Sequence, residues 1–232
     1  LRKRIMEVAY RKQLDEYLEK IDSVIENGRY KDNWESLSAY PVPIWYKNAK
    51  FGVFLHWGVY SVPAYYSEWY PRLMYYKGTP VYWHHKKKYG KDFNYRDFVP
   101  MFKAEKFDAE KWVSILKSAG AKYIMPVGEH HDGYKMYDSD LSQWTSVKQA
   151  PHCDFLGELR KECDKQGVTF ATSSHRAEHF WFLNGGRTVG YDNEVLDEKY
   201  RDFYGPAYNI HKINNLHNLL KQEHGITPSK EW

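Results

Sequence analysis

Cysteine is scarce in this sequence, and it has no long apolar run. The two cysteines are Cys153 and Cys163. If the segment between them is helical they lie roughly 15 Å apart, too far for a disulfide bond, so we expect two free thiols. The longest uncharged, apolar-rich run, residues 51–66, contains a histidine, a Trp-Gly pair and a proline. It therefore cannot form the ~20-residue apolar helix that spans a bilayer, and we expect no membrane partner.

A strong excess of one charge is also lacking. The 232 residues carry 34 basic and 30 acidic side chains, a formal net charge of +4, with both signs interspersed. This pattern predicts no nucleic-acid partner, and we interpret the basic run 84–88 as a solvated helix face. The chain starts at Leu1 without the apolar segment of a signal peptide, which leaves its localisation open. We interpret both ends as belonging to a longer polypeptide.

The first part of the chain differs in pattern from the rest. Apolar residues within 5–26 recur at helical spacing, charged residues occupy the other face, and Asn27-Gly28 provides a stop signal. A polar, proline-bearing connector follows over residues 29–43. We therefore predict an N-terminal helical extension over residues 1–40 and a separate domain over residues 41–232.

Short apolar runs alternate with amphipathic segments in the second part. The predicted strands, all fully buried, cover residues 50–56, 122–127 and 168–172. The predicted helices cover residues 108–120, 154–166 and 209–222. The helix over 108–120 is expected to point Trp112, Ile115, Leu116 and Ala119 inward, and the helix over 154–166 to bury Phe155, Leu156, Leu159 and Cys163. This order predicts βαβ units around a parallel sheet, and the long loops after each strand favour a barrel with a pocket at its carboxyl end.

Polar and aromatic clusters follow each predicted strand. They are His56-Trp57-Gly58, Glu129-His130-His131-Asp132-Gly133, and Ser173-Ser174-His175. The carboxyl end of a parallel sheet is where ligands bind, so these clusters are candidates for one site.

Three interpretations of the cluster at 129–133 are open. A neutral imidazole offers one donor and one acceptor, which suits a sugar or another polyol. The same groups could satisfy the backbone of their own loop, or they could bind a metal ion. Neighbouring residues leaving a strand point to opposite sides, so His130 and His131 would not readily share one ion.

Two further groups bear on the site. Glu68 and Trp69 follow the first strand, and a carboxylate beside an aromatic ring is typical of carbohydrate pockets, although a core tryptophan with a surface glutamate is equally open. His175 and His179 have the i, i+4 spacing of a zinc helix, but no glutamate follows His175 directly, which favours a hydrogen-bonding pocket residue. Phosphate loops, nucleophile elbows and Cys-x-x-Cys pairs are absent from the sequence, and we expect no cofactor and no bound metal.

Several of these motifs together resemble glycoside hydrolase family 29, the α-L-fucosidases. Residues 45–64 and 67–70 resemble that family's first barrel strand and loop, residues 120–133 its second signature, and residues 154–159 the helix after it. The resemblance covers roughly residues 41–185. It implies a (β/α)8-like TIM barrel and a retaining exo-glycosidase that releases L-fucose from fucosylated glycans.

The resemblance also implies a site. His56, Glu68, Trp69, His130 and His131 would line the fucose pocket, whose mouth would account for the 18% aromatic content. His175 stands where many members carry a Tyr-Tyr-Ser run, and would replace the hydrogen bond of that tyrosine to the nucleophile region.

The resemblance further implies that part of the catalytic apparatus lies elsewhere. Retaining hydrolysis needs two carboxyl groups ~5 Å apart. The family's nucleophile is an aspartate in a Trp-Phe-Asp context and its acid/base comes later; no such motif precedes Trp232. Three βα units of eight cannot close a barrel, so the remainder of the same barrel is the expected partner. The alternatives are a non-catalytic carbohydrate-binding fragment and a metal-dependent hydrolase using His130, His131, His175 and His179.

Overall fold

A computed structural model describes residues 2–184, 195 and 197–204. The chain divides into two compact units, Leu1–Lys50 and Phe51–Trp232, which are described separately. The helix predicted over 209–222 lies outside the described residues. Within the described residues, no helix has both the length and the apolar character needed to cross a membrane.

The first unit is helical, as predicted. It consists of α1 (Arg2–Asn27), α2 (Trp34–Ser38) and α3 (Ile44–Ala49). The short helix α2 falls within the predicted connector and begins at Asn33, whose side-chain oxygen accepts a hydrogen bond from the Ser36 amide at 2.8 Å. The division between an extension and a domain at residue 40 stays a prediction.

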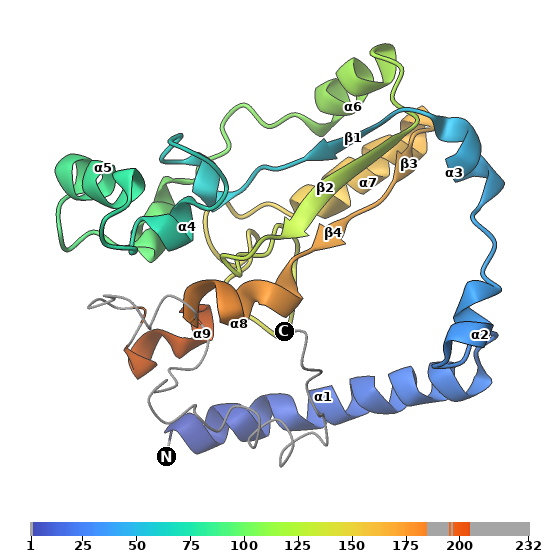
Figure 1. Cartoon of the computed structure of the whole chain (residues 1–232), viewed down its shortest axis with the longest axis horizontal. Helices are drawn as coiled ribbons and strands as arrows, with labels where there is room; N and C mark the ends of the chain where they lie inside the picture. Colours follow the sequence, from blue (N-terminus) through green and yellow to red (C-terminus); the bar gives the residue numbers. More distant parts are fainter. Residues whose placement is uncertain (1, 185–194, 196, 205–232) are drawn as a thin grey trace. The chain divides into compact units, whose positions relative to one another are not determined.

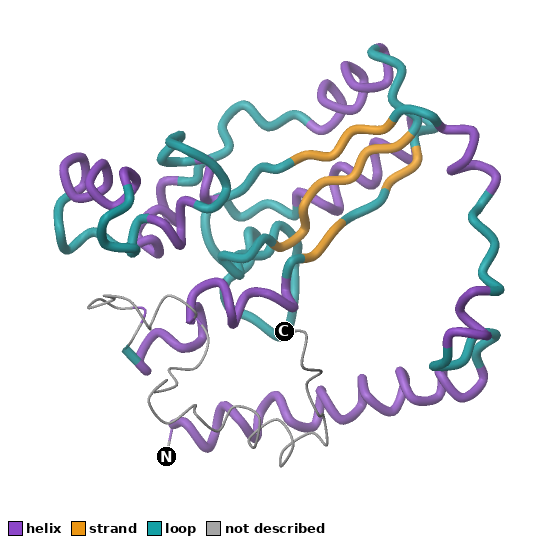
Figure 2. The backbone as a smooth tube through the Cα atoms, in the orientation of Figure 1, coloured by secondary structure: helices purple, strands orange, loops and turns teal. Residues whose placement is uncertain are grey.

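The second unit is built on a parallel sheet. Its strands are β1 (Gly52–Leu55), β2 (Tyr123–Glu129), β3 (Thr169–Phe170) and β4 (Ser173–Ser174). The strand β2 is central, with β1 on one side and both β3 and β4 on the other (Figures 1 and 2). The α/β class and the parallel pairing predicted from the sequence are thus confirmed.

The third predicted strand, residues 168–172, is shorter than expected and corresponds to β3, while β4 follows it in the predicted cluster 173–175, after a proline in β2 interrupts the pairing. Ala171 donates its amide to the carbonyl of Ile124 at 3.0 Å, so Pro126, two residues further along β2, faces the same neighbour. Proline has no N–H to continue the ladder. The Thr172 hydroxyl instead donates to the Pro126 carbonyl at 3.0 Å, and pairing resumes with Val127 opposite Ser173, before a register shift between Val127 and Glu129.

Two helices pack beside the sheet and form a small core with it. They are α6 (Ala109–Ser118) and α7 (Phe155–Gln166). The buried residues of this core are Val113, Ile124, Leu159, Cys163 and Val168. All four expected residues of α7 are buried or half-buried, and both cysteines are free, as predicted.

Two of the four residues predicted to point inward from α6 do so. Trp112 and Leu116 pack against the core as expected, but Ile115 is 56% exposed and Ala119 is also exposed. The buried face is centred between Trp112 and Val113, roughly 100° around the helix from Ile115, because each residue advances the helix by that angle.

The prediction that β1 is fully buried is wrong. Phe54 is 45% exposed, and its ring lies 4.5 Å from that of His56, two residues along the same face. Within the described residues, this face of β1 is therefore only partly covered.

The loops and helices at the carboxyl end of the sheet form the larger core. The elements after β1 are η1 (Val59–Ser61), α4 (Tyr70–Leu73), α5 (Pro80–Tyr89) and η2 (Tyr95–Met101), and those after β4 are α8 (Arg176–Asn184), η5 (Glu198–Tyr200) and α9 (Arg201–Tyr204). Its largest fully buried side chains include Tyr70, Tyr75, Tyr95, Tyr134, Tyr204, Phe98, Phe155, Phe182 and Phe203. Much of the aromatic content therefore fills this core, which corrects its assignment to a pocket mouth.

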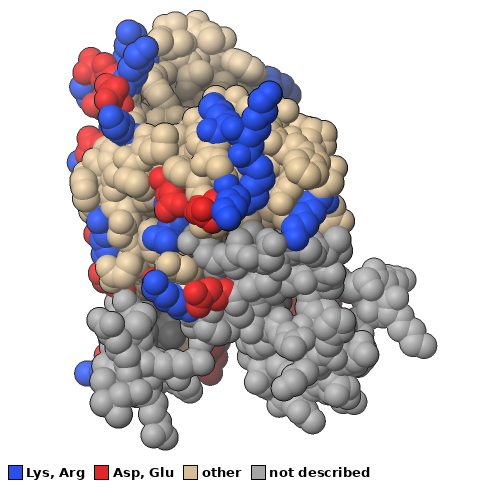
Figure 3. All heavy atoms as spheres, turned by 90° about the vertical axis from the view of Figure 1, so that its left-hand side faces the viewer, with Lys and Arg blue, Asp and Glu red and all other residues tan. Residues whose placement is uncertain are grey.

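The basic run on α5 is not uniformly solvated. His85 is completely buried, with Nδ1 2.9 Å from the Tyr70 hydroxyl and Nε2 2.8 Å from the Phe93 carbonyl oxygen. It lies one turn after the buried Val81 and so shares its face. On the side of the molecule drawn in Figure 3, basic side chains lie in separate groups with acidic ones beside several of them.

The start of α7 provides a test of the fold. The Asp154 carboxylate accepts a hydrogen bond from the Gly157 amide at 2.9 Å. Replacing this N-cap, Asp154→Ala, is expected to lower the free energy of unfolding by about 1 kcal/mol, measured by urea denaturation. Asp154→Asn retains an N-cap acceptor, so its free energy of unfolding should fall much less. An equal decrease in the two variants would contradict the capping role.

Candidate functional site

Histidines from three strand ends meet at the carboxyl end of the sheet. His56 follows β1, His130 follows β2 and His175 follows β4. The ring centroids lie 5.5 Å apart for His56 and His130, 4.5 Å for His130 and His175, and 6.1 Å for His56 and His175. Residues separated by more than 100 positions in the sequence are thus brought into one cluster, as the strand-end argument predicts.

The second histidine of the pair lies beside the same cluster, with its ring 4.5 Å from that of His130 and 4.6 Å from that of His175. The His131 ring stacks on Phe182 with centroids 4.7 Å apart and lies edge-on to Trp69 at 5.6 Å. His131 is 5% exposed and Trp69 is 38% exposed. The tryptophan ring therefore packs on the cluster from one side and leaves part of its surface open.

Glu68 completes the set of sequence-predicted residues. It is half-buried, and its negative charge acts on His56. Burial lowers the pKa of His56, and the Glu68 carboxylate partly opposes that shift. All six predicted residues therefore lie in one neighbourhood, although their role in binding stays a prediction.

His130 is held as a neutral imidazole. It is 3% exposed, and burial, followed by the charges of the neighbouring histidines, lowers its pKa to about 3. Its Nδ1 atom is buried without a hydrogen-bond partner, and so is the hydroxyl of Tyr60, whose ring lies 5.0 Å away. Unsatisfied buried polar atoms are costly, so these two groups are candidates for contact with a polar ligand.

A buried carboxylate with two cationic partners holds the end of β2. Glu129 is 2% exposed, and its Oε1 lies 2.9 Å from the Arg176 guanidinium and 3.3 Å from the Lys135 ammonium. Burial lowers the pKa of Lys135, and the charge of Glu129 opposes this. The Glu129 carbonyl oxygen accepts a hydrogen bond from the His175 amide at 2.8 Å. One residue thus fixes both the β2 end and the position of His175.

Asp132 anchors the turn that follows the histidine pair. Its carboxylate accepts hydrogen bonds from the Tyr95 hydroxyl at 2.6 Å and from the Tyr134 amide at 3.1 Å. Burial raises its pKa from 3.8 to about 6, against the effect of these two donors. Next to it, Gly133 has φ 80°, and a Cβ there would lie 2.4 Å from the His179 ring. Only glycine fits this turn without displacement.

His179 supports the site from outside the cluster. Its Nδ1 lies 2.7 Å from the carbonyl oxygen of His131 and donates to it, and burial lowers its pKa to about 4. The four-histidine set of the metal-hydrolase alternative is therefore not assembled as predicted. The set that the described residues bring together is His56, His130 and His175, whose ligand nitrogens lie within 4.8 Å of one another.

Sequence reasoning missed several residues that shape the site. Tyr60 and Phe182 contribute their side chains directly, while Tyr95 and Lys135 act through the two buried carboxylates. The place of Tyr60 after the first strand was the one local signal available. The other three are identified only by contacts between distant segments.

The fold is similar to part of known fucosidase catalytic domains. The structure of a Thermotoga maritima alpha-fucosidase in complex with a mechanism-based inhibitor superposes with a TM-score of 0.64 at 30% identity, covering 86% of this chain and 48% of that one. The same organism's alpha-L-fucosynthase, in complex with a fucosyl disaccharide azide, gives a TM-score of 0.61 at 38% identity, covering 63% of this chain and 38% of that one.

Sequence comparison agrees with the structural one. Residues 17–223 match the family model described as Alpha-L-fucosidase, and the chain belongs to this family. It is 40% identical over 156 residues to the tissue alpha-L-fucosidase of Bos taurus, covering 66% of this chain and 33% of that protein. It is 38% identical over 157 residues to the alpha-L-fucosidase of Dictyostelium discoideum, covering 63% of this chain and 33% of that protein. The match thus spans about a third of the length of these relatives.

The buried carboxyl of Asp132 gives the site a pH signature. Because its pKa is raised to about 6 in the folded protein, the folded state holds the proton more tightly, and this group destabilises the fold as pH rises from about 4 to about 7. We expect the wild type to lose up to about 3 kcal/mol relative to Asp132→Asn over that range, measured by urea denaturation at several pH values. The exposed Asp138→Asn controls for loss of one charge. A difference that stays constant with pH would contradict the prediction.

Proposed function

We propose that the protein is a retaining exo-α-L-fucosidase that releases L-fucose from glycans, and that this chain supplies most of the fucose-binding pocket. The observation that carries the proposal is the convergence of His56, His130 and His175, beside unpartnered polar atoms, in a chain of this family. The partner is a fucosylated glycan. The titles of related structures name complexes of those proteins with fucose and with a mechanism-based inhibitor, which supports the same substrate class.

The side chains suit a sugar in complementary ways. Neutral imidazoles at His56 and His130 each offer a donor and an acceptor to hydroxyl groups. The Glu68 carboxylate accepts from two hydroxyls at once, and the open part of the Trp69 ring packs on the C–H face of the sugar. His131 is fixed by its stacking on Phe182, so its ring is oriented before the sugar arrives.

The catalytic carboxylates of the proposed reaction lie beyond Trp232. Glu129 is engaged by Arg176 and Lys135, and Asp132 accepts two hydrogen bonds, so both are committed to internal partners. We assign Glu68 to substrate binding. An aspartate nucleophile and a separate acid/base, ~5 Å apart, would then come from later strands of the same barrel.

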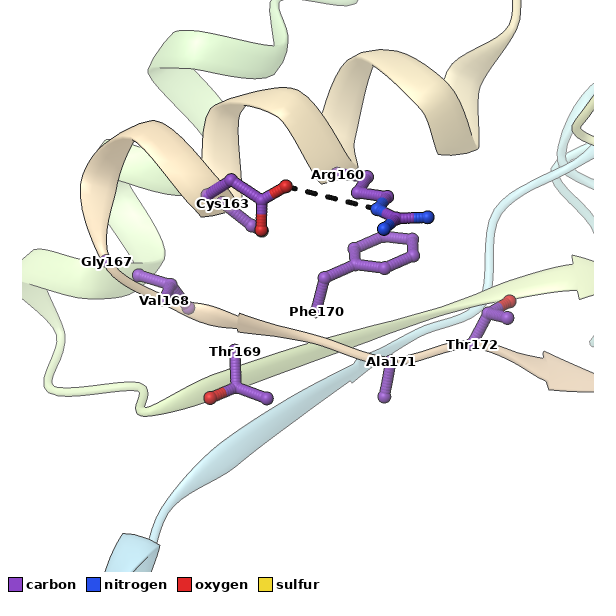
Figure 4. A pocket seen from close by; sticks show the side chains of 9 residues that line it. Arg160, Cys163, Gly167, Val168, Thr169, Phe170, Ala171 and Thr172 are labelled. Carbon is purple, nitrogen blue, oxygen red and sulfur yellow. Dashed lines mark ion pairs between the residues drawn. The ribbon is translucent and has the colours of Figure 1, made fainter. Parts of the chain in front are cut away.

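The parallel sheet represents the first βα units of a (β/α)8 barrel in this proposal. The outer edges of β1 and of β3 pair with no other described strand, and such edges are covered in barrels. A groove of about 580 Å³ runs beside α7 and the third-strand segment, from Arg160 to Thr172, with Phe170 along it (Figure 4). The remainder of the barrel would pack here, residues 41–232 forming the amino-terminal half of the catalytic domain and residues 1–40 an extension.

Substitution of His130 tests the pocket. In the full-length protein, His130→Gln should lower kcat/KM for a nitrophenyl α-L-fucoside by about 10- to 100-fold. The substitution leaves buried polar groups of the bound complex without hydrogen-bond partners, which costs ~1–3 kcal/mol. Fucose should inhibit the variant more weakly by a similar factor. The matched control is His152→Gln, on an exposed loop. Unchanged kinetics and unchanged fucose affinity in His130→Gln would contradict the pocket assignment.

The configuration of the first product tests the mechanism. Proton NMR of the hydrolysis reaction should show α-L-fucose released first, the anomer of the substrate, because two successive displacements retain configuration. Initial release of the β-anomer would rule out retention. Fucose binding by the full-length protein without any hydrolysis would instead favour a non-catalytic carbohydrate-binding protein.

A further inference from the structure

We propose that His56, His130 and His175 form a binding site for one Zn²⁺ ion, and that the ion competes with the sugar for the same place. The second half of this proposal rests on the proposed fucosidase function; the first does not. The zinc site is inferred from the positions of the three histidine side chains alone.

The geometry of the three rings is close to that of a zinc site. Their ligand nitrogens lie within 4.8 Å of one another. Three nitrogens bound tetrahedrally at 2.0–2.1 Å from zinc would be ~3.3 Å apart, so each nitrogen has to move inward by roughly 1 Å or less. Rotation about side-chain torsions provides such a movement, because His56 is exposed and His175 is half-buried.

The least mobile ligand is already oriented. His130 is 3% exposed, and its Nδ1 has no hydrogen-bond partner among the described residues. Its neighbour His175 is held through its backbone amide by the Glu129 carbonyl. A buried, unsatisfied imidazole with two further imidazoles beside it presents three nitrogen ligands, a set that zinc prefers.

The neighbouring imidazoles are not counted as ligands. The His131 ring lies 4.6 Å from that of His175, but it stacks on Phe182 and is not part of the three-histidine group. His179 donates to a backbone carbonyl. The Glu68 charge acts on His56 and would favour a cation close to it. A three-histidine site with an open position accepts water or an exogenous ligand, as in catalytic zinc sites.

Competition with the sugar follows from use of the same atoms. An imidazole nitrogen that is bound to zinc has no lone pair left to accept a hydrogen bond from a hydroxyl group. If His56 and His130 accept hydrogen bonds from sugar hydroxyls as proposed above, zinc and sugar compete for the same lone pairs. Zinc would then act as a reversible inhibitor rather than as a cofactor.

Direct metal binding tests the site without reference to activity. Calorimetric titration of the full-length protein with ZnCl2 should show one Zn²⁺ per chain, and Co²⁺ should give the visible absorption of a tetrahedral complex. His175→Gln and His56→Gln should each weaken Zn²⁺ binding by at least the ~10- to 100-fold seen for loss of an outer-shell partner. The exposed His152→Gln should bind zinc as the wild type does. No binding, or binding that neither pocket variant weakens, would overturn the site.

Kinetics test the competition separately. Zinc should raise the apparent KM for a nitrophenyl α-L-fucoside without changing kcat in the wild type, and His175→Gln should need at least tenfold more zinc for the same effect. Zinc binding at these histidines with no effect on KM would overturn the competition. Zinc binding in a protein that hydrolyses no fucoside would refute the proposed function and leave the metal site standing. Hydrolysis of the fucoside by a protein that binds no zinc would refute the metal site and leave the proposed function standing.

Discussion

The site depends on the buried carboxylate of Glu129. It is the last residue of β2, and through it the strand end is joined to Arg176 at the start of α8, to Lys135 in the following loop, and to the backbone of His175. Removing a buried carboxylate from water costs several kcal/mol, and two cations with short contacts are needed to offset that cost. Such a cluster therefore specifies one arrangement of the strand end more than it stabilises the fold.

This arrangement determines where the histidines lie. Because Glu129 ties β4 and α8 to β2, His175 is brought beside His130, and α8 delivers both Phe182 and His179 to His131. A register shift between Val127 and Glu129 contributes as well. It places Ser174, the residue before His175, opposite Glu129. An irregularity at the end of β2 thus helps to set the geometry of the site.

Local patterns predicted the elements, and strand order predicted where the site lies. Short apolar runs indicated the strands, and Asp154 and Gly167 indicated the ends of α7. Such patterns can be read from the sequence because strand burial and helix capping depend on residues that are close together in the chain. The convergence of side chains at one end of the sheet followed from parallel topology alone.

The features that the sequence could not predict depend on contacts between segments that are far apart in the chain. Ile115 was assigned to the wrong face, because a two-sided apolar helix does not show which side meets the sheet. The Asp132–Tyr95 hydrogen bond joins residues 37 positions apart, and Tyr60 became a site residue only when its hydroxyl was buried without a partner. These groups look like ordinary core or loop residues in the sequence, since their polarity matters only after folding has removed water.

The third histidine gives the site a chemistry that two would not have. With His56 and His130 alone, the strand ends would offer imidazoles suited to hydroxyl groups and a weak metal site. His175 comes from the strand on the other side of β2, where its ring lies 4.5 Å from that of His130, and it adds a third nitrogen ligand to the same space. In the two proposals above, the same imidazole nitrogens serve a sugar and a zinc ion. Which of them occupies the pocket would then depend on their concentrations, because the contact that holds His175 beside His130 contributes to both proposed sites.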